Sequence, residues 1–185
     1  MNNQKSSNVI LTGFRGTGKT TVGKMLATRL QWVFVDMDEQ LTQRLGASIA
    51  EVVARQGWAF FRQEEARLLQ ELQTMRCTVL ATGGGAIEHQ QEWQQLRNCG
   101  YVVWLDADIA TIRRRLMTDP VSAQQRPSLT GQSVQDEIGD LLERRIPLYR
   151  AGSDLQLATD DKEPEELANQ ILRAVKLNKQ PLHSD

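Results

Sequence analysis

The sequence is poor in cysteine and histidine, which argues against several kinds of site. Among 185 residues there are two cysteines, Cys77 and Cys99, and they do not form a C-x-x-C pair. We therefore expect core thiols rather than a disulfide or a metal site. The two histidines, His89 and His183, stand without companion metal ligands, so we expect both to lie at the surface.

Long apolar runs and an excess of either charge are also missing. The longest apolar stretches, such as residues 101–105, are far too short to span a bilayer, and residues 1–8 lack the apolar core of a secretory signal. The 22 basic residues are scattered among 23 acidic ones, so no basic stripe is available to follow a nucleic-acid backbone. The sequence thus predicts a cytoplasmic protein that partners neither a membrane nor a nucleic acid.

A phosphate-binding pattern stands near the N-terminus. Residues 13–20, GFRGTGKT, fit G-x-x-x-x-G-K-[ST]; they follow the apolar run 9–11 and open a segment of helical periodicity. In such a loop several backbone N–H groups point at a polyphosphate, at φ/ψ values that side chains would obstruct. Lys19 would add charge at the β- and γ-phosphates, and Thr20 would offer a hydroxyl to Mg²⁺.

The helix after this loop would add the partial positive charge of its N-terminus. The candidate nucleotide-binding residues are Gly13, Arg15, Gly16, Thr17, Gly18, Lys19, Thr20 and Thr21. The chain is therefore expected to bind a nucleoside triphosphate together with magnesium.

Short apolar runs alternate with amphipathic segments along the chain, which is typical of parallel strands joined by crossover helices in an α/β fold. The length suits one domain with a single core and leaves no room for a second substrate domain. The expected strands lie near residues 8–12, 33–36, 77–82, 101–105 and 154–158. Helices are expected over about 22–30, from about 48, and over 58–75, 89–98, 108–117, 133–146 and 164–177. Residues 118–132 have neither periodicity nor much apolar content, and such a stretch in a nucleotide enzyme is a candidate lid.

Two acidic residues end the second expected strand. Asp36 and Asp38 are two positions apart, so both carboxylates can face one site at the carboxyl edge of the sheet. One could hold Mg²⁺ through water, and the other could accept the proton of a substrate hydroxyl. Alternatively, Asp38 caps a helix that begins at Glu39.

Three glycines and three arginines complete the candidate site. The glycines of ATGGG, residues 83–85, follow the third expected strand and would allow close backbone approach to a ligand. Arg62, Arg126 and Arg145 each carry a planar fork suited to carboxylate or phosphate, so their convergence would indicate an anionic substrate. Alternatively, Arg62 is structural and pairs with Glu65 across one helical turn.

Together these segments resemble the shikimate kinase family. The match extends from Val9 to about Leu172. It contains, in order, GFRGTGKTT, VDMD, FFRQEE, ATGGG, an Arg-Pro pair in the lid region and ERRIPLY. The resemblance implies the three-layer P-loop kinase fold, with five parallel strands in the order 2-3-1-4-5 and helices on both faces. It implies transfer of the ATP γ-phosphoryl group to the 3-hydroxyl of shikimate, which gives 3-phosphoshikimate on the route to chorismate and the aromatic amino acids.

The resemblance also implies ATP and Mg²⁺ as cofactors. It implies a single kinase domain over residues 1–185, with a core of about 8–175, a lid of about 118–132 and an acceptor-binding region of about 36–65. We expect this kinase to be a monomer.

The roles of individual residues carry over from the family to matching positions. Asp38 would contact the accepting hydroxyl, and Asp36 would lie near Mg²⁺ and its waters. Arg62 and Arg145 would hold the shikimate carboxylate, while Arg126 in the lid would reach the phosphates. The backbone of Gly83, Gly84 and Gly85 would approach the substrate.

The adenine pocket is carried over less directly. Arg115 aligns with an arginine that lies over adenine, but Arg113 and Arg114 beside it leave that choice open. Lys162, at a position that is often arginine, and Pro164 would close the other side of the pocket.

Two other functions stay open at this stage. Another small-metabolite kinase, such as a gluconate kinase, would share the phosphate loop but would not need the arginine pair. A regulatory or scaffold protein could keep the fold and lose turnover. The intact set Lys19, Thr20, Asp36, Asp38 and Arg126 argues against this second alternative.

Overall fold

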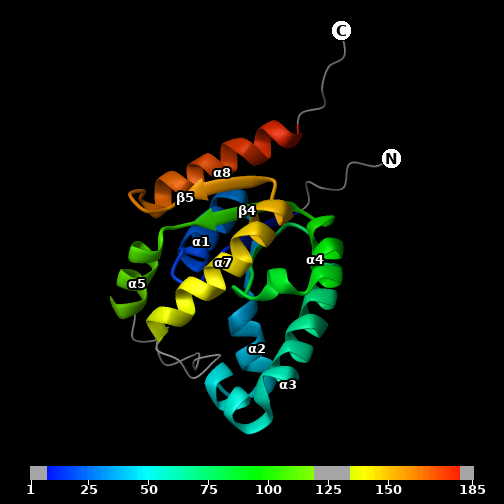
Figure 1. Cartoon of the computed structure of the whole chain (residues 1–185). Helices are drawn as coiled ribbons and strands as arrows, with labels where there is room; N and C mark the ends of the chain where they lie inside the picture. The colour runs from blue at the N-terminus through cyan, green and yellow to red at the C-terminus, as the bar shows by residue number, and fades with distance from the viewer. Residues whose placement is uncertain (1–7, 119–133, 180–185) are drawn as a thin grey trace.

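Five parallel strands form the centre of the computed structural model, which describes residues 8–118 and 134–179 (Figure 1). The strands are β1 (Asn8–Thr12), β2 (Val33–Asp36), β3 (Thr78–Ala81), β4 (Tyr101–Asp106) and β5 (Leu155–Ala158). Their order is β2-β3-β1-β4-β5, so the first strand lies in the middle of the sheet. This order confirms the predicted fold, and the strand ends differ from the predicted ones by at most one residue.

Helices connect successive strands, as parallel pairing requires. They are α1 (Lys19–Leu30), α2 (Met37–Leu45), α3 (Ile49–Leu72), α4 (Gln90–Arg97), α5 (Ile109–Thr118) and α7 (Val134–Gly152), with the short 3₁₀ turn η2 (Ala86–Glu88) before α4. A last helix, α8 (Pro164–Lys179), follows β5. Helix α8 packs beside α1 on one face of the sheet.

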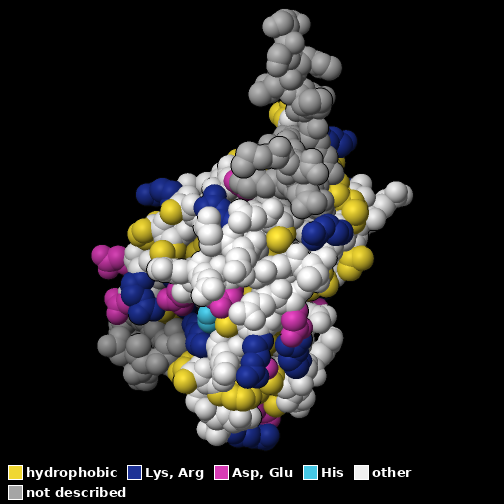
Figure 2. All heavy atoms as spheres, turned by 90° about the vertical axis from the view of Figure 1, so that its right-hand side faces the viewer, with side chains coloured by type: hydrophobic (Ala, Val, Ile, Leu, Met, Phe, Trp, Pro, Cys, Tyr) yellow, Lys and Arg dark blue, Asp and Glu magenta, His cyan; other side chains and the backbone are white. Residues whose placement is uncertain are grey.

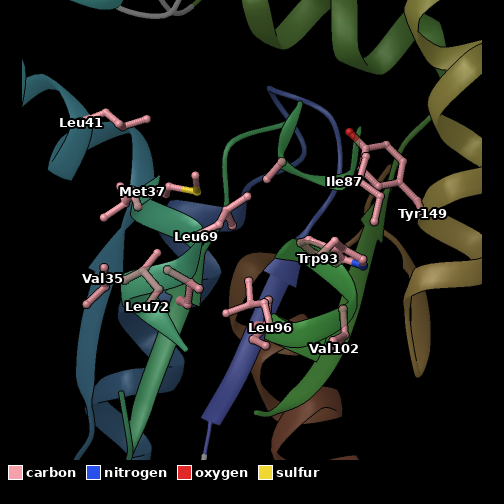
Figure 3. Close-up of a cluster of buried hydrophobic side chains, with 14 of the residues drawn as sticks. Val35, Met37, Leu41, Leu69, Leu72, Ile87, Trp93, Leu96, Val102 and Tyr149 are labelled. Atoms are coloured by element: carbon pink, nitrogen blue, oxygen red, sulfur yellow. The ribbon is translucent and has the colours of Figure 1, made fainter. Parts of the chain in front are cut away.

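The central strand β1 is buried on both faces because its side chains alternate between two cores. Val9 and Leu11 join a cluster with residues of α1 and α8, such as Leu26 and Ile171. Ile10 points the other way, into a cluster with residues of α3, α4 and α7. Figure 3 shows side chains of this second core lying over the sheet. The sheet is therefore covered by helices on both faces, as predicted.

The long helix α3 joins two predicted helices. Its start is the predicted capping box: Ser48 Oγ accepts a hydrogen bond from the Glu51 N–H at 3.2 Å, and the Ser48 N–H donates to Glu51 Oε2 at 2.9 Å. The two predicted segments meet at Gly57, whose φ of 81° and ψ of 167° are not helical. Only glycine adopts this conformation readily, so Gly57 sets the direction of the second half, which carries Arg62.

Helix α7 runs further than predicted. The predicted helix ends at residue 146, just before Pro147, but the helix continues to Gly152. Beyond the proline, Tyr149 is fully buried and stacks on Trp104 with ring centroids 5.7 Å apart. This packing against β4 outweighs the backbone hydrogen bond that the proline cannot make.

Two expectations about single residues are wrong. Cys77 is exposed rather than buried, because it lies in the turn before β3 with a φ of 52°, and Cys99 is half-buried. The His89 side chain is only 14% exposed and its Nε2 lies 2.9 Å from Glu65 Oε2, so this histidine is not a surface residue. His183 lies outside the described residues.

Charges are interspersed on the surface. Figure 2 shows basic and acidic side chains side by side on the face that it presents. None of the helices in residues 8–118 and 134–179 has the length and apolar character that a membrane span needs.

Candidate functional site

The phosphate loop links β1 to α1 and depends on glycine at two positions for different reasons. Gly18 is the N-cap of α1 with a φ of 88° and a ψ of 13°, a left-handed conformation that disfavours side chains. A Cβ there would meet nothing within 4 Å, so the backbone angle alone selects glycine. At Gly13 a Cβ would lie 2.2 Å from the Leu105 carbonyl oxygen, so close packing against β4 excludes a side chain.

Side chains of the loop fold back onto its backbone. Lys19 Nζ donates to the carbonyl oxygens of Gly13 and Phe14, both at 2.8 Å. The buried Thr17 hydroxyl donates to the Phe14 carbonyl at 2.8 Å. The lysine charge is thereby held over the loop, next to the positive end of α1, where an anion is favoured.

Asp36 connects this loop to α2. Its Oδ2 accepts a hydrogen bond from the Thr20 hydroxyl at 2.7 Å, while its Oδ1 accepts from the Asp38 N–H at 3.0 Å. Asp36 is therefore the N-cap, and the alternative that Asp38 caps a helix from Glu39 is wrong. The helix begins at Met37, directly after the strand, which puts Asp38 in its first turn.

In the part of the chain that the structure describes, two clefts adjoin the loop. The larger, of about 760 Å³, is lined by Lys19, Thr20, Asp36, Asp38 and Gly84, among others. The smaller, of about 550 Å³, is lined by Thr159, Lys162 and Pro164, among others. The clefts share Gly18, Thr21 and Arg115 along their walls. Acidic and phosphate-loop residues thus face one space, and the expected adenine-pocket residues face the next.

Arg115 is held in place between the two clefts. It donates to the Thr159 hydroxyl at 2.9 Å, to the Thr159 carbonyl at 2.6 Å and to the Gly16 carbonyl at 3.2 Å. Arg114 instead donates to the Thr111 hydroxyl within α5 at 3.4 Å. Of the three consecutive arginines, Arg115 is the one that lines both clefts.

The arginines of α3 and α7 meet at one carboxylate. Glu88 Oε2, at the end of η2, accepts from Arg145 Nη2 at 2.7 Å and lies 3.5 Å from Arg62 Nη2. Arg62 also pairs with Glu65, whose side chain is fully buried. The expected convergence of the two arginines and the alternative pairing within α3 are therefore both present.

Arg145 joins this cluster to the phosphate loop. It is 4% exposed, and its guanidinium carbon lies 5.9 Å from the centre of the Phe14 ring, within the loop. Its buried Nε has no hydrogen-bond partner among the residues that the structure describes. A buried guanidinium N–H without a partner is costly, so this atom is a ready donor for an anion.

The glycines after β3 make room for these contacts. A Cβ on Gly85 would lie 2.2 Å from Arg62 Nη1, so only glycine admits the guanidinium here. The Gly84 carbonyl accepts a hydrogen bond from the buried Tyr149 hydroxyl at 2.5 Å. Gly83 accepts from the Ala86 N–H at 3.1 Å, which starts η2. Gly85 thus makes room for the Arg62 guanidinium, and the approach of the three glycines to a substrate stays a prediction.

Some residues of the site were not identified from the sequence. Tyr149 stands in the ERRIPLY segment, but nothing in that segment alone indicates its bond to Gly84. Glu88 follows the three glycines closely, yet its pairing depends on where α3 and α7 lie. Arg126 and residues 119–132 of the expected lid lie outside the described residues.

Similarity to known proteins agrees with this geometry. Residues 15–176 match the family model described as shikimate kinase. A shikimate kinase of Syntrophus aciditrophicus is 41% identical over 174 residues, covering 90% of this chain and 89% of that protein. A shikimate kinase of Rhodopirellula baltica is 39% identical over 176 residues, covering 94% of each chain.

A solved structure is similar over nearly the whole chain. It is a shikimate kinase from Acinetobacter baumannii in complex with shikimate, with a TM-score of 0.87 and 33% identity, covering 96% of this chain and 97% of that one. Because the family model spans most of the sequence and relatives above 30% identity cover almost all of it, the chain belongs to the shikimate kinase family.

Proposed function

We propose that this protein transfers the γ-phosphoryl group of ATP to the 3-hydroxyl of shikimate. The observation that carries the proposal is the position of Arg145, which contacts the phosphate-loop residue Phe14 and shares Glu88 with Arg62. A carboxylate gripped by these two arginines would lie beside the phosphate loop. The hydroxyl of the same small acceptor would then be held near the transferring phosphoryl group.

The chain's own residues supply alignment and charge. Lys19 and the loop N–H groups stabilise negative charge on the phosphates, and Asp38 orients or deprotonates the acceptor hydroxyl in the same cleft. The second cleft, with Arg115, Lys162 and Pro164, would take the adenine.

Magnesium fits the residues present. The Thr20 hydroxyl is a suitable oxygen ligand, and Asp36 at 2.7 Å from it can hold a bound water. No group of three or more His, Cys, Asp or Glu that could hold a metal occurs within residues 8–118 and 134–179. A Mg²⁺ ion here would take most of its ligands from phosphates and water, and it would offset charge between the β- and γ-phosphates.

Arg126 remains part of the proposal through the family resemblance alone. It is expected to contact the phosphates mainly in the transition state. Arg126→Ala should therefore lower kcat much more than it raises either KM. Equal changes in kcat and both KM values would contradict this role.

A coupled assay of ADP release tests the proposed function. Shikimate, gluconate and nucleoside monophosphates are offered in parallel at equal concentration with ATP and Mg²⁺, and a reaction without acceptor serves as the baseline. We expect acceptor-dependent ADP release with shikimate alone. Gluconate and nucleoside monophosphates are also anions, so the discrimination expected here depends on holding the acceptor carboxylate at Arg62 and Arg145 with its hydroxyl beside the phosphate loop. Faster release with gluconate or a nucleotide would contradict the proposal.

A cytoplasmic monomer that binds no nucleic acid remains our expectation for the enzyme. Light scattering after size-exclusion chromatography measures its mass directly. A mass near 20.9 kDa is expected, and a dimer mass would contradict the monomer.

A further inference from the structure

Glu88 contacts three guanidinium groups at once. Its Oε2 pairs with Arg145 at 2.7 Å and with Arg62 at 3.5 Å, while its Oε1 pairs with Arg144 at 3.3 Å. The Glu88 side chain is 28% exposed, and Arg144 is 66% exposed. The carboxylate thus bridges the two inner arginines and one outer arginine.

The two carboxylates of this cluster are not equivalent. Glu65 is fully buried, lies one helical turn from Arg62 and has His89 Nε2 2.9 Å away, so its side chain has little room to move. Glu88 belongs to a short 3₁₀ turn and reaches solvent, so its side chain can turn away at little cost. Glu88 is also the carboxylate that Arg145 contacts in the described part of the chain.

The charges of the cluster match an anionic acceptor. Three guanidinium groups, of Arg62, Arg144 and Arg145, meet two carboxylates, of Glu65 and Glu88. Within the described residues, the place of the Glu88 carboxylate is surrounded by three guanidinium groups, which suits a carboxylate. An acceptor carboxylate that bridges Arg62 and Arg145 would lie where Glu88 Oε2 lies, and two carboxylates at one guanidinium face repel each other.

We propose that Glu88 is an internal competitor of the acceptor's carboxylate. Before binding, it holds Arg62 and Arg145; on binding, it withdraws toward Arg144 and the acceptor takes its place. This inference rests on the proposed function. Glu88 is accordingly a residue that sets acceptor affinity through the arginines, and it does not contact the reacting atoms.

Steady-state kinetics of E88Q test the proposal. The amide keeps the shape of the side chain but removes its charge, so the arginines are released more easily. The KM for shikimate should fall about two- to fivefold, the range expected for a partly exposed ion pair, while the KM for ATP stays unchanged. A shikimate KM that is unchanged or higher would overturn the proposal, because Glu88 would then be inert or would position the arginines.

Arg144 provides a test with the opposite sign. If Arg144 receives the displaced carboxylate, R144Q should raise the shikimate KM in the wild-type background and leave it unchanged in E88Q. An equal rise in both backgrounds would mean that Arg144 acts on the acceptor directly, which contradicts its part in the exchange.

E71Q is the matched control. Glu71 pairs with Arg44 on the other side of α3 in an exposed ion pair, so its substitution should change neither KM. Melting curves verify that each variant is folded. If E88Q unfolds, E88D replaces it. E88D keeps the charge but has a shorter side chain, so it should also lower the shikimate KM. Should wild type fail to phosphorylate shikimate, the proposed function fails; should only the E88Q effect be absent, this inference alone fails.

Discussion

The phosphate end and the acceptor end of the site are built in different ways. The phosphate end is one continuous loop, residues 13–20, in which Lys19 donates hydrogen bonds to the loop's own carbonyl oxygens. The acceptor end assembles Arg62, Glu88 and Arg145 from three elements, with pairs 26 and 57 positions apart in sequence. Local backbone geometry secures the first, whereas the second depends on how helices are placed. The two ends should therefore fail in different ways.

The largest loss of activity is expected from substitution of one side chain at the phosphate end. Lys19→Ala removes the positive charge over the loop, and we expect kcat/KM to fall more than about a hundredfold, or ~2.7 kcal/mol, with the fold intact. Rates and circular dichroism are measured together. Lys24→Ala, in the same helix but 59% exposed and facing Glu39, is the control and should stay near wild type. Retention of a tenth of wild-type activity by Lys19→Ala would refute the assigned role.

Shikimate binding at the acceptor end should weaken when the planar guanidinium of Arg62 is lost, even if the positive charge remains. Arg62→Lys is expected to raise the shikimate KM about tenfold, ~1.4 kcal/mol, with little change in the ATP KM. Arg67→Lys is the control, because Arg67 lies on the same helix and pairs with the neighbouring Glu64. Equal effects of Arg62→Lys on both substrates would mean that Arg62 serves only its pairing with Glu65.

The acceptor end should also respond to a change in the path of its helix. Gly57→Ala places a side chain on a backbone with a φ of 81°, so we expect a loss of about 1–3 kcal/mol in the free energy of unfolding. Urea denaturation measures it. Gly139→Ala is the same substitution in α7, where a Cβ meets nothing within 4 Å, and it should be neutral or stabilising. A neutral Gly57→Ala would show that the kink is not required.

The smallest effect is expected where the two ends meet. Tyr149→Phe removes the donor to the Gly84 carbonyl, and we expect a loss of about 1 kcal/mol in the free energy of unfolding. The loss is of the size expected for one neutral hydrogen bond. Tyr101→Phe, at the partly exposed start of β4, is the control. A loss no greater than that of the control would contradict the role of the Tyr149 hydroxyl.

The phosphate end was predictable from sequence because its structural elements are adjacent in the chain. A strand, a glycine-rich loop and a helix follow one another within residues 8–30, and each carries its own pattern. The sequence left open whether Asp38 faces the site or caps a helix from Glu39, because the start of that helix depends on the end of β2. The structure settles it through the position of Met37.

The acceptor end was predictable only in part. The spacing of Arg62 and Glu65 indicated their pairing, since residues three apart share a helix face. The convergence on Glu88 could not be predicted, because it requires the relative placement of η2, α3 and α7. The continuation of α7 past Pro147 was missed for a similar reason, since the packing of Tyr149 on Trp104 is a long-range contact.

The central claim is that Arg62 and Arg145 bind the acceptor through its carboxylate. The most direct test compares kcat/KM for shikimate and for its carboxamide analogue, on wild type and on Arg62→Lys. On wild type, the account predicts that kcat/KM for the carboxamide is about tenfold or more below that for shikimate, ~1.4 kcal/mol. On Arg62→Lys the difference in kcat/KM should be clearly smaller, because the amide and the lysine each remove the same arginine–carboxylate interaction. An equal loss on both enzymes would show that the carboxylate and Arg62 act independently, which would contradict the claim.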